Sequence, residues 1–149
     1  MRSVLLAAAV AALALVPTAA GDAVYHSQHI GLSPVATDET GTGFVENIHA
    51  NGPNVYAHEQ YALKGALPST DYVVWIHVSA PADDTCAVPI LEAPTATFTT
   101  NPAGNGAAYH VFTPADIGAL RGSTVHVYWT VTAGGSPAYA TACQTIQLD

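Results

Sequence analysis

Histidine is the side chain whose number and placement in this sequence most suggest chemistry. Seven histidines occur in 149 residues, at His26, His29, His49, His58, His77, His110 and His126. Neutral imidazole is the commonest metal ligand in proteins, and two histidines on a β-strand share a face when they are two residues apart. No His-x-His spacing occurs here. A metal site would therefore have to combine histidines from different segments.

His49 and His58 form the best pair for such a site. They flank the turn signal Asn51-Gly52-Pro53, with Glu46 and Glu59 close by in the sequence. Asn and Gly tolerate the positive φ of a tight hairpin, which would bring the two arms together. The register of the hairpin decides whether the histidines share a face, and one sequence does not fix it. An exported metal-binding protein is one hypothesis, and scattered histidines without a ligand are the alternative.

Aromatic side chains suggest a second kind of site. Trp75 and Tyr128 lie in two segments with the alternation of strands. If both rings point outward, they would form a platform for a sugar or a protein surface, since aromatic rings offer a large contact area. The alternative is that both rings are partly buried in the fold.

Enzyme motifs are scarce in the sequence. It contains no Gly-x-Ser-x-Gly nucleophile motif and no Gly-x-x-x-x-Gly-Lys phosphate loop. Asp83, Asp84 and Glu92 could offer oxygens to a calcium ion, but no EF-hand spacing surrounds them, and a solvated acidic loop is the simpler interpretation. We therefore predict a protein that is not an enzyme and needs no cofactor. A small secreted hydrolase is the less favoured alternative.

Cys86 and Cys143 are predicted to form a disulfide. An even number of cysteines in an exported chain usually pairs, and two cysteines allow only one pairing. No Cys-x-x-Cys spacing suggests thiol exchange. The bond is thus expected to stabilise the fold, and two free thiols are the alternative.

The segment 1–20 has the pattern of a signal peptide. Arg2 is followed by an apolar run from Val4 to Val16, and Pro17-Thr18-Ala19-Ala20 then supplies the small residues that a signal peptidase reads. A membrane anchor would need about 20 apolar residues, and this run is shorter. We expect cleavage after segment 1–20, with Ala23 as the alternative cleavage site, one domain over 21–149, and a secreted protein without a membrane span.

The charge balance argues against one class of partner. Three basic residues stand against eleven acidic ones, and the net charge is −8. Nucleic acids and anionic lipid surfaces are both bound through patches of Lys and Arg. We therefore expect no nucleic-acid partner, and consider an extracellular protein or a glycan instead.

Short strand-like segments alternate with turn signals after residue 23. Segments rich in Val, Thr, Tyr and Ala are separated by Gly, Pro, Asn and Asp, which is typical of β-proteins. The expected strands are 24–30, 43–50, 55–63, 73–79, 95–100, 107–112, 124–131 and 139–148. Tight turns are expected at 51–53, 101–106 and 134–137, and Thr113-Pro114-Ala115-Asp116 predicts a short turn of helix. About eight strands at this spacing indicate an all-β, antiparallel, two-sheet sandwich.

One corner of the sequence resembles fibronectin type III and related immunoglobulin-like sandwiches. The resemblance is carried by Gly65-Ala66-Leu67-Pro68-Ser69-Thr70-Asp71-Tyr72 and the alternating strand Val73-Val74-Trp75-Ile76-His77-Val78. In that family a tyrosine hydroxyl bonds back to upstream backbone. The resemblance implies that Tyr72 has this role and faces the core together with Val74, Ile76 and Val78. It implies a sandwich architecture and no activity.

The chain as a whole is similar to a group of small exported bacterial proteins without an assigned role. The stretches that carry this likeness are His49-Ala50-Asn51-Gly52-Pro53, Tyr56-Ala57-His58-Glu59-Gln60-Tyr61, Thr99-Thr100-Asn101-Pro102-Ala103-Gly104-Asn105, Phe112-Thr113-Pro114-Ala115-Asp116 and Gln147-Leu148-Asp149. The likeness implies no chemistry. We thus expect a secreted, non-catalytic module that binds or scaffolds.

Overall fold

The computed structural model describes residues 26–49, 57–120 and 122–148. Almost all of the regular structure in these residues is β-strand, and the all-β class is confirmed. The elements are β1 (His26–Pro34), β2 (Thr42–His49), β3 (Ala57–Lys64), β4 (Asp71–Ser79), β5 (Pro89–Thr99), β6 (Gly106–Phe112), α1 (Pro114–Ile117), the 3-10 turn η1 (Gly118–Leu120), β7 (Thr124–Ala133), β8 (Ser136–Ala140) and β9 (Gln144–Gln147).

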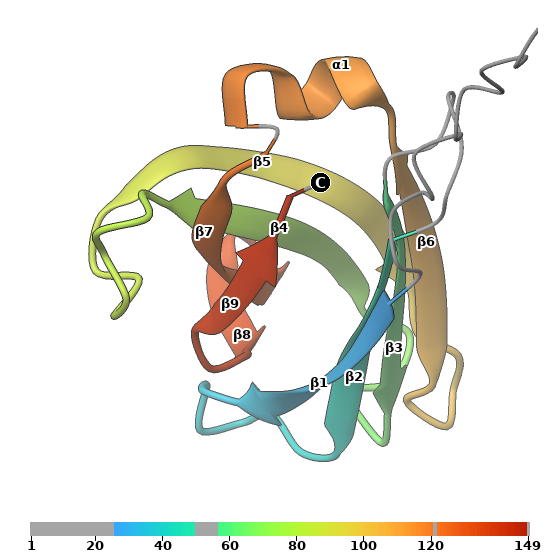
Figure 1. Cartoon of the computed structure of the whole chain (residues 1–149). Coiled ribbons are helices and arrows are strands. Elements are labelled where there is room, and N and C mark those ends of the chain that lie inside the picture. Colours follow the sequence, from blue (N-terminus) through green and yellow to red (C-terminus); the bar gives the residue numbers. More distant parts are fainter. Residues whose placement is uncertain (1–25, 50–56, 121, 149) are drawn as a thin grey trace, which may run out of the picture.

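The strands form one nearly closed antiparallel sheet. Its hydrogen-bonded order is β5-β4-β7-β8-β1-β2-β3-β6, and β9 also pairs with β7. Strands β1, β2, β3 and β6 make one side of the roll, and β4, β5, β7 and β9 make the other (Figure 1). The two sides are joined by a short ladder between β1 and β8, at Ser33–Ala140 and Pro34–Tyr139. Because this ladder makes the sheet continuous, the expected pair of separate sheets is not confirmed.

The sheet does not close between its end strands, β5 and β6. Strand β5 pairs with β4 and β6 pairs with β3, and no ladder joins β5 to β6 in the described residues. The turn between them forms as expected, since the Asn101 side-chain oxygen accepts the N–H groups of Ala103 and Asn105 at 2.9 and 3.0 Å. The expected strands and turn are therefore present, but the strands pair with other neighbours. We call the unpaired line between β5 and β6 the seam.

Strands β4 and β7 show the alternation that the sequence predicts. Alternate residues of β4 from Tyr72 to Val78 are buried, and Val73, Trp75 and His77 are only half-buried. In β7 the buried alternate residues run from Val125 to Val131. Because side chains on a strand point to opposite faces in turn, this burial fixes which face of each strand lines the interior.

Two expected strands differ from the structure in extent or continuity, and one expected turn lies outside the described residues. Strand β1 continues to Pro34, beyond the expected end at residue 30, and pairs with both β2 and β8. The expected strand 139–148 is split into β8 and β9, because the chain leaves the ladder around Cys143, which is bonded elsewhere. The turn at 51–53 lies outside the described residues, and the hairpin around it is confirmed by the pairing of β2 with β3.

The predicted disulfide between Cys86 and Cys143 is present, with their Cα atoms 5.8 Å apart. It ties the loop between β4 and β5 to the segment between β8 and β9. Asp83 organises the same loop, because its carboxylate accepts the Val88 N–H at 2.8 Å and the Thr85 hydroxyl at 2.9 Å. These bonds lower the pKa of Asp83 to about 2.

Tyr72, the second residue of β4, is fully buried, as expected. Its hydroxyl donates to Glu39 Oε1 at 2.7 Å, and the Tyr139 hydroxyl lies 2.8 Å from Glu39 Oε2. Burial, followed by these contacts with Glu39, raises the pKa of Tyr72, while a hydrogen bond from the Leu67 backbone acts in the opposite direction. The hydroxyl of Tyr72 is therefore held by the buried Glu39 carboxylate.

The short helix α1 begins as the sequence predicts. The Thr113 N–H and hydroxyl donate to Asp116 Oδ2 at 2.7 and 2.8 Å, and Pro114 occupies the first turn. Helix α1 and turn η1 lie across one end of the rolled sheet (Figure 1). In the described part of the chain, no helix has the length and apolar character to cross a membrane.

Candidate functional site

The interior of the rolled sheet contains a cavity of about 470 Å³. Residues of β2, β3 and β6 line one wall, residues of β4, β5, β7 and β9 line the other, and Asp116 and Leu120 close one end. This volume falls within the range of small-molecule sites, roughly 300–1,000 Å³. Residues of both β5 and β6 line the cavity, so the seam between these two strands lies in the cavity wall.

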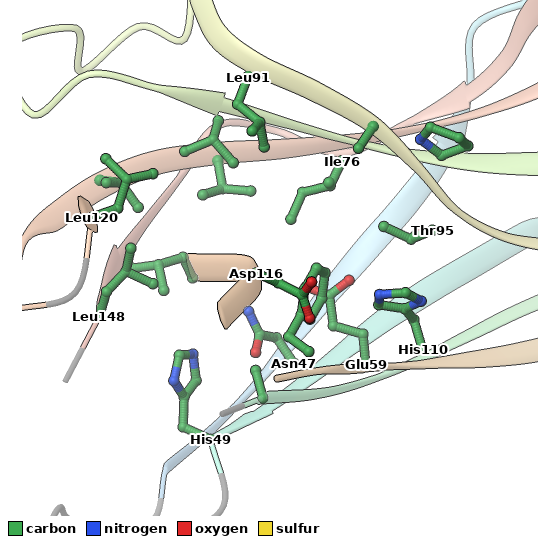
Figure 2. Close-up of a pocket in the computed structure, with 18 residues that line it drawn as sticks. Asn47, His49, Glu59, Ile76, Leu91, Thr95, His110, Asp116, Leu120 and Leu148 are labelled. Atoms are coloured by element: carbon green, nitrogen blue, oxygen red, sulfur yellow. The ribbon is translucent and has the colours of Figure 1, made fainter. Parts of the chain in front are cut away.

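Most of the cavity wall is apolar. Its aliphatic side chains come from strands on the β4 side of the roll and from the end of the chain, and include Ile76, Val78, Leu91, Val127, Ile146 and Leu148. Figure 2 shows Ile76, Leu91, Leu120 and Leu148 around one part of the cavity. An apolar ligand that binds against this wall removes apolar surface from water, which favours binding.

Three polar residues cross the opposite wall in a row. Asn47 on β2 pairs directly with Glu59 on β3, and Glu59 pairs directly with His110 on β6. All three line the cavity, and Figure 2 shows Asn47 and Glu59 turned toward the same region with His110 beside Glu59. Directly opposite residues have Cβ atoms about 5 Å apart. We call Asn47, Glu59 and His110 the polar row.

Glu59 is the most deeply buried member of the polar row, with 1% of its surface exposed. The Trp129 indole N–H donates to Glu59 Oε2 at 2.9 Å, and the Tyr61 hydroxyl donates to the same oxygen. The Tyr61 hydroxyl also forms a hydrogen bond with the Thr95 hydroxyl, and the two oxygens are 2.9 Å apart. Burial raises the pKa of Glu59 from 4.5 to about 7, although the two hydrogen bonds act in the opposite direction. The carboxyl group can therefore exchange a proton near neutral pH.

Asn47 brings a buried acceptor that nothing in the described structure satisfies. The residue is 5% exposed, and its Oδ1 has no hydrogen-bond partner. Leaving a buried polar atom without a partner costs about 1–3 kcal/mol. Because Asn47 also lines the cavity, a molecule inside the cavity is placed to supply the missing donor.

Asp116 and His49 extend the polar region at its margin. Asp116 is exposed where α1 meets the cavity, and its hydrogen bonds from Thr113 hold its pKa below the usual range. His49 is buried at the end of β2 and lines the cavity. The described wall residues include no Lys or Arg. Among the described wall residues, the polar end of the cavity thus offers several acceptors and carries no permanent positive charge.

The structure does not bring His49 and His58 together as a metal pair. Along β3, Ala57, Glu59 and Tyr61 point inward, so His58 lies on the outer face, where its ring meets Tyr109 edge-on with centroids 5.8 Å apart. His49 points inward. Across the described residues, no three His, Cys, Asp or Glu side chains converge as a metal site. The alternation of the strands places the two predicted ligands on opposite faces of the sheet.

Trp75 and Tyr128 lie on the same outer face of neighbouring strands. Trp75 is directly opposite Thr130, and Tyr128 is directly opposite His77, whose ring stacks on it with centroids 4.3 Å apart. Both aromatic residues are half-buried. Their use as a binding platform stays a prediction.

His77 forms a chain of hydrogen bonds on this outer face. Its Nδ1 is 2.7 Å from Glu92 Oε1, and its Nε2 is 2.8 Å from the Thr130 hydroxyl. Carboxylate, imidazole and hydroxyl follow one another as in the triads of hydrolases. Such enzymes also need N–H donors for a developing oxyanion, but the backbone of β4 and β7 here is engaged in sheet pairing. These hydrogen bonds hold Glu92, His77 and Thr130 in fixed positions on the outer face.

Comparison of the chain with protein-family models, curated proteins and solved structures finds no match. The geometry of the cavity is therefore the basis for proposing a function.

The polar row was not predicted from the sequence. Its three members come from three strands, and they meet only because of the registers of β2 with β3 and of β3 with β6. One signal was present: Glu59 occupies the inward position of a strand whose other inward residues are Ala57, Tyr61 and Leu63. An acid at a core position of an alternating strand is unusual, since acids are almost never fully buried unless paired.

Proposed function

We propose that this protein binds a small, mainly apolar molecule inside the rolled sheet and holds its polar end at the polar row. The observation that carries this proposal is a buried carboxyl and an unpartnered amide oxygen on one wall of an otherwise apolar cavity. Ligand sites usually combine apolar walls with a few convergent polar groups.

Without a ligand, the polar row lowers the stability of the folded state. Asn47 Oδ1 lacks a donor, and Glu59 is removed from water to the extent that its pKa reaches about 7. Apolar side chains of similar size at these positions would avoid both penalties. Departures from good packing and polar satisfaction tend to occur at functional sites, so their convergence on one cavity supports a binding role.

The cavity sets the size of the ligand. A molecule in a packed site needs about 30 Å³ for each water-sized group, so 470 Å³ accommodates roughly 15 such groups. This matches a lipid-derived or aromatic molecule of modest size better than a folded partner or a long oligosaccharide.

Binding can be tested with N-phenyl-1-naphthylamine, a weakly polar dye that becomes fluorescent in apolar surroundings. The variant Val127→Phe projects a larger side chain into the cavity, and the matched control Val111→Phe places the same side chain on the outer face of β6. We expect the wild type and the control to bind alike and Val127→Phe to bind about tenfold more weakly. Equal binding by all three proteins, or no dye binding by the wild type, would contradict the proposal.

A second candidate function is acid–base catalysis on the bound molecule by Glu59. Its pKa of about 7 is the observation that favours it, because a general acid or base works best near the operating pH. The test is deuterium exchange from D₂O into a bound ketone, followed by mass spectrometry. Exchange in the wild type that disappears in Glu59→Gln supports catalysis, and equal exchange in both argues against it.

Export completes the proposal. The leader-like segment 1–20 and the disulfide between Cys86 and Cys143 support a protein that works outside the cytoplasm. The burial of Tyr72 supports the relationship to immunoglobulin-like sandwiches that the sequence suggested. Both remain proposals, as does an extracellular protein or glycan partner for the outer face.

A further inference from the structure

Several acceptor groups line the polar end of the cavity, together with the imidazole rings of His49 and His110. Asn47 offers a buried oxygen without a donor, Glu59 offers a carboxyl group, and Asp116 adds a carboxylate at the margin. No Lys or Arg is found among the described wall residues. A ligand that brings hydrogen-bond donors would complete this arrangement, whereas a ligand that brings only acceptors would leave Asn47 Oδ1 unsatisfied.

The charges favour a positively charged donor over a neutral one. An ammonium group has three donors and can serve both Asn47 Oδ1 and the Glu59 carboxylate. A cation next to Glu59 also stabilises the ionised form of that buried acid, which a neutral hydroxyl does much less. The net charge of the chain, −8, further attracts cations and repels anions.

We infer that the ligand is an amine with an apolar body, whose ammonium group is held by Asn47 and Glu59 while the body lies along the aliphatic wall. This inference rests on the proposed binding function and names the class of molecule bound. Charge-assisted hydrogen bonds hold the head, and burial of apolar surface holds the body.

Binding of an amine must then depend on pH. Glu59 has to lose its proton to pair with the ammonium group, and its pKa before binding is about 7. The ionised fraction rises about tenfold between pH 6 and pH 8, so the affinity should rise by about the same factor. The other titratable groups facing this region are His49 on β2, Tyr61 on β3, His110 on β6 and Asp116 on α1. Protonated histidines would weaken amine binding at low pH in the same direction, so a variant is needed to separate them from Glu59.

The first experiment compares three ligands with the same chain and different head groups. Calorimetry with n-octylamine, 1-octanol and octanoate at pH 8 should give the tightest binding for the amine, about tenfold tighter than for the alcohol, and no measurable binding for the carboxylate. Binding of the alcohol or the carboxylate at least as tightly as the amine overturns the inference and leaves the binding function standing. If none of the three binds and the naphthylamine dye does not bind either, the binding function itself fails.

The second experiment assigns the pH dependence to Glu59. Glu59→Gln keeps an acceptor for Tyr61 and Trp129, and should lose about tenfold in amine affinity at pH 8 with no rise between pH 6 and pH 8. The matched control is Glu46→Gln, which removes an acid from the outer face of β2, where it pairs with His29 at 2.8 Å. The control should bind the amine as the wild type does. If Glu59→Gln keeps the tenfold rise, the histidines cause it and the inference is overturned.

Discussion

Replacing Glu59 with Gln should stabilise the protein relative to the wild type as the pH rises. Burial raises the pKa of Glu59 from 4.5 to about 7 in the folded state, whereas the unfolded chain titrates near the ordinary value. Between these values the folded protein holds a proton that the unfolded chain has released. The stability that Glu59 provides is therefore complete below about pH 4.5 and is lost as the pH rises through 7.

The magnitude follows from the same two pKa values. One unit of pKa difference corresponds to about 1.4 kcal/mol, so the difference between 4.5 and about 7 corresponds to about 3 kcal/mol. Gln does not titrate and keeps the shape of the side chain. The free energy of unfolding of Glu59→Gln minus that of the wild type should therefore rise by about 3 kcal/mol from pH 4 to pH 8.5.

Urea unfolding followed by tryptophan fluorescence at several pH values measures this difference. Other titrating groups contribute to both proteins and cancel in the subtraction. Val127→Ala serves as a control because it shortens a cavity-wall residue without changing a titratable group, and its offset from the wild type should stay constant with pH. A Glu59→Gln offset that is equally constant would show that the acid is solvated and that the account of the polar row is wrong.

Other changes should alter stability in ways that urea or thermal unfolding can measure. Replacing both Cys86 and Cys143 with Ser should cost about 4 kcal/mol by loop entropy, since the bond spans 57 residues of sequence; an unchanged urea midpoint would contradict this. Asn47→Leu should raise the free energy of unfolding by about 1 kcal/mol, because it removes an unpartnered buried acceptor; a large loss would mean that Asn47 has a structural role. Tyr72→Phe should cost about 2 kcal/mol by leaving Glu39 with one tyrosine donor fewer, and a melting temperature equal to that of the wild type would refute that.

The strands with one clearly buried face were predictable from sequence. In β7 the inward positions from Val125 to Val131 are large and apolar, and a shift by one residue would expose them all. The cap of α1 was also local in origin, because Thr113 and Asp116 are three residues apart and meet in the first turn. Such features depend on near neighbours in the chain.

Features that depend on distant pairing were not predictable. The alternation of β5 and β6 suggests a hairpin. In the structure, however, β5 pairs with β4 and β6 pairs with β3. The continuity of the sheet rests on the short ladder at Ser33 and Pro34, where a proline would ordinarily suggest a loop. The polar row was unpredictable for the same reason. Asn47, Glu59 and His110 become neighbours only through the registers of β2 with β3 and of β3 with β6.

The seam has a consequence for how long a guest molecule stays inside. A molecule that departs between β5 and β6 breaks no ladder of main-chain hydrogen bonds, because the described strands form none there. The dissociation rate of the ligand would then depend on local opening of the side chains at the seam, and not on the barrier to global unfolding. Off-rates and unfolding rates should accordingly vary independently of each other from one substitution to the next.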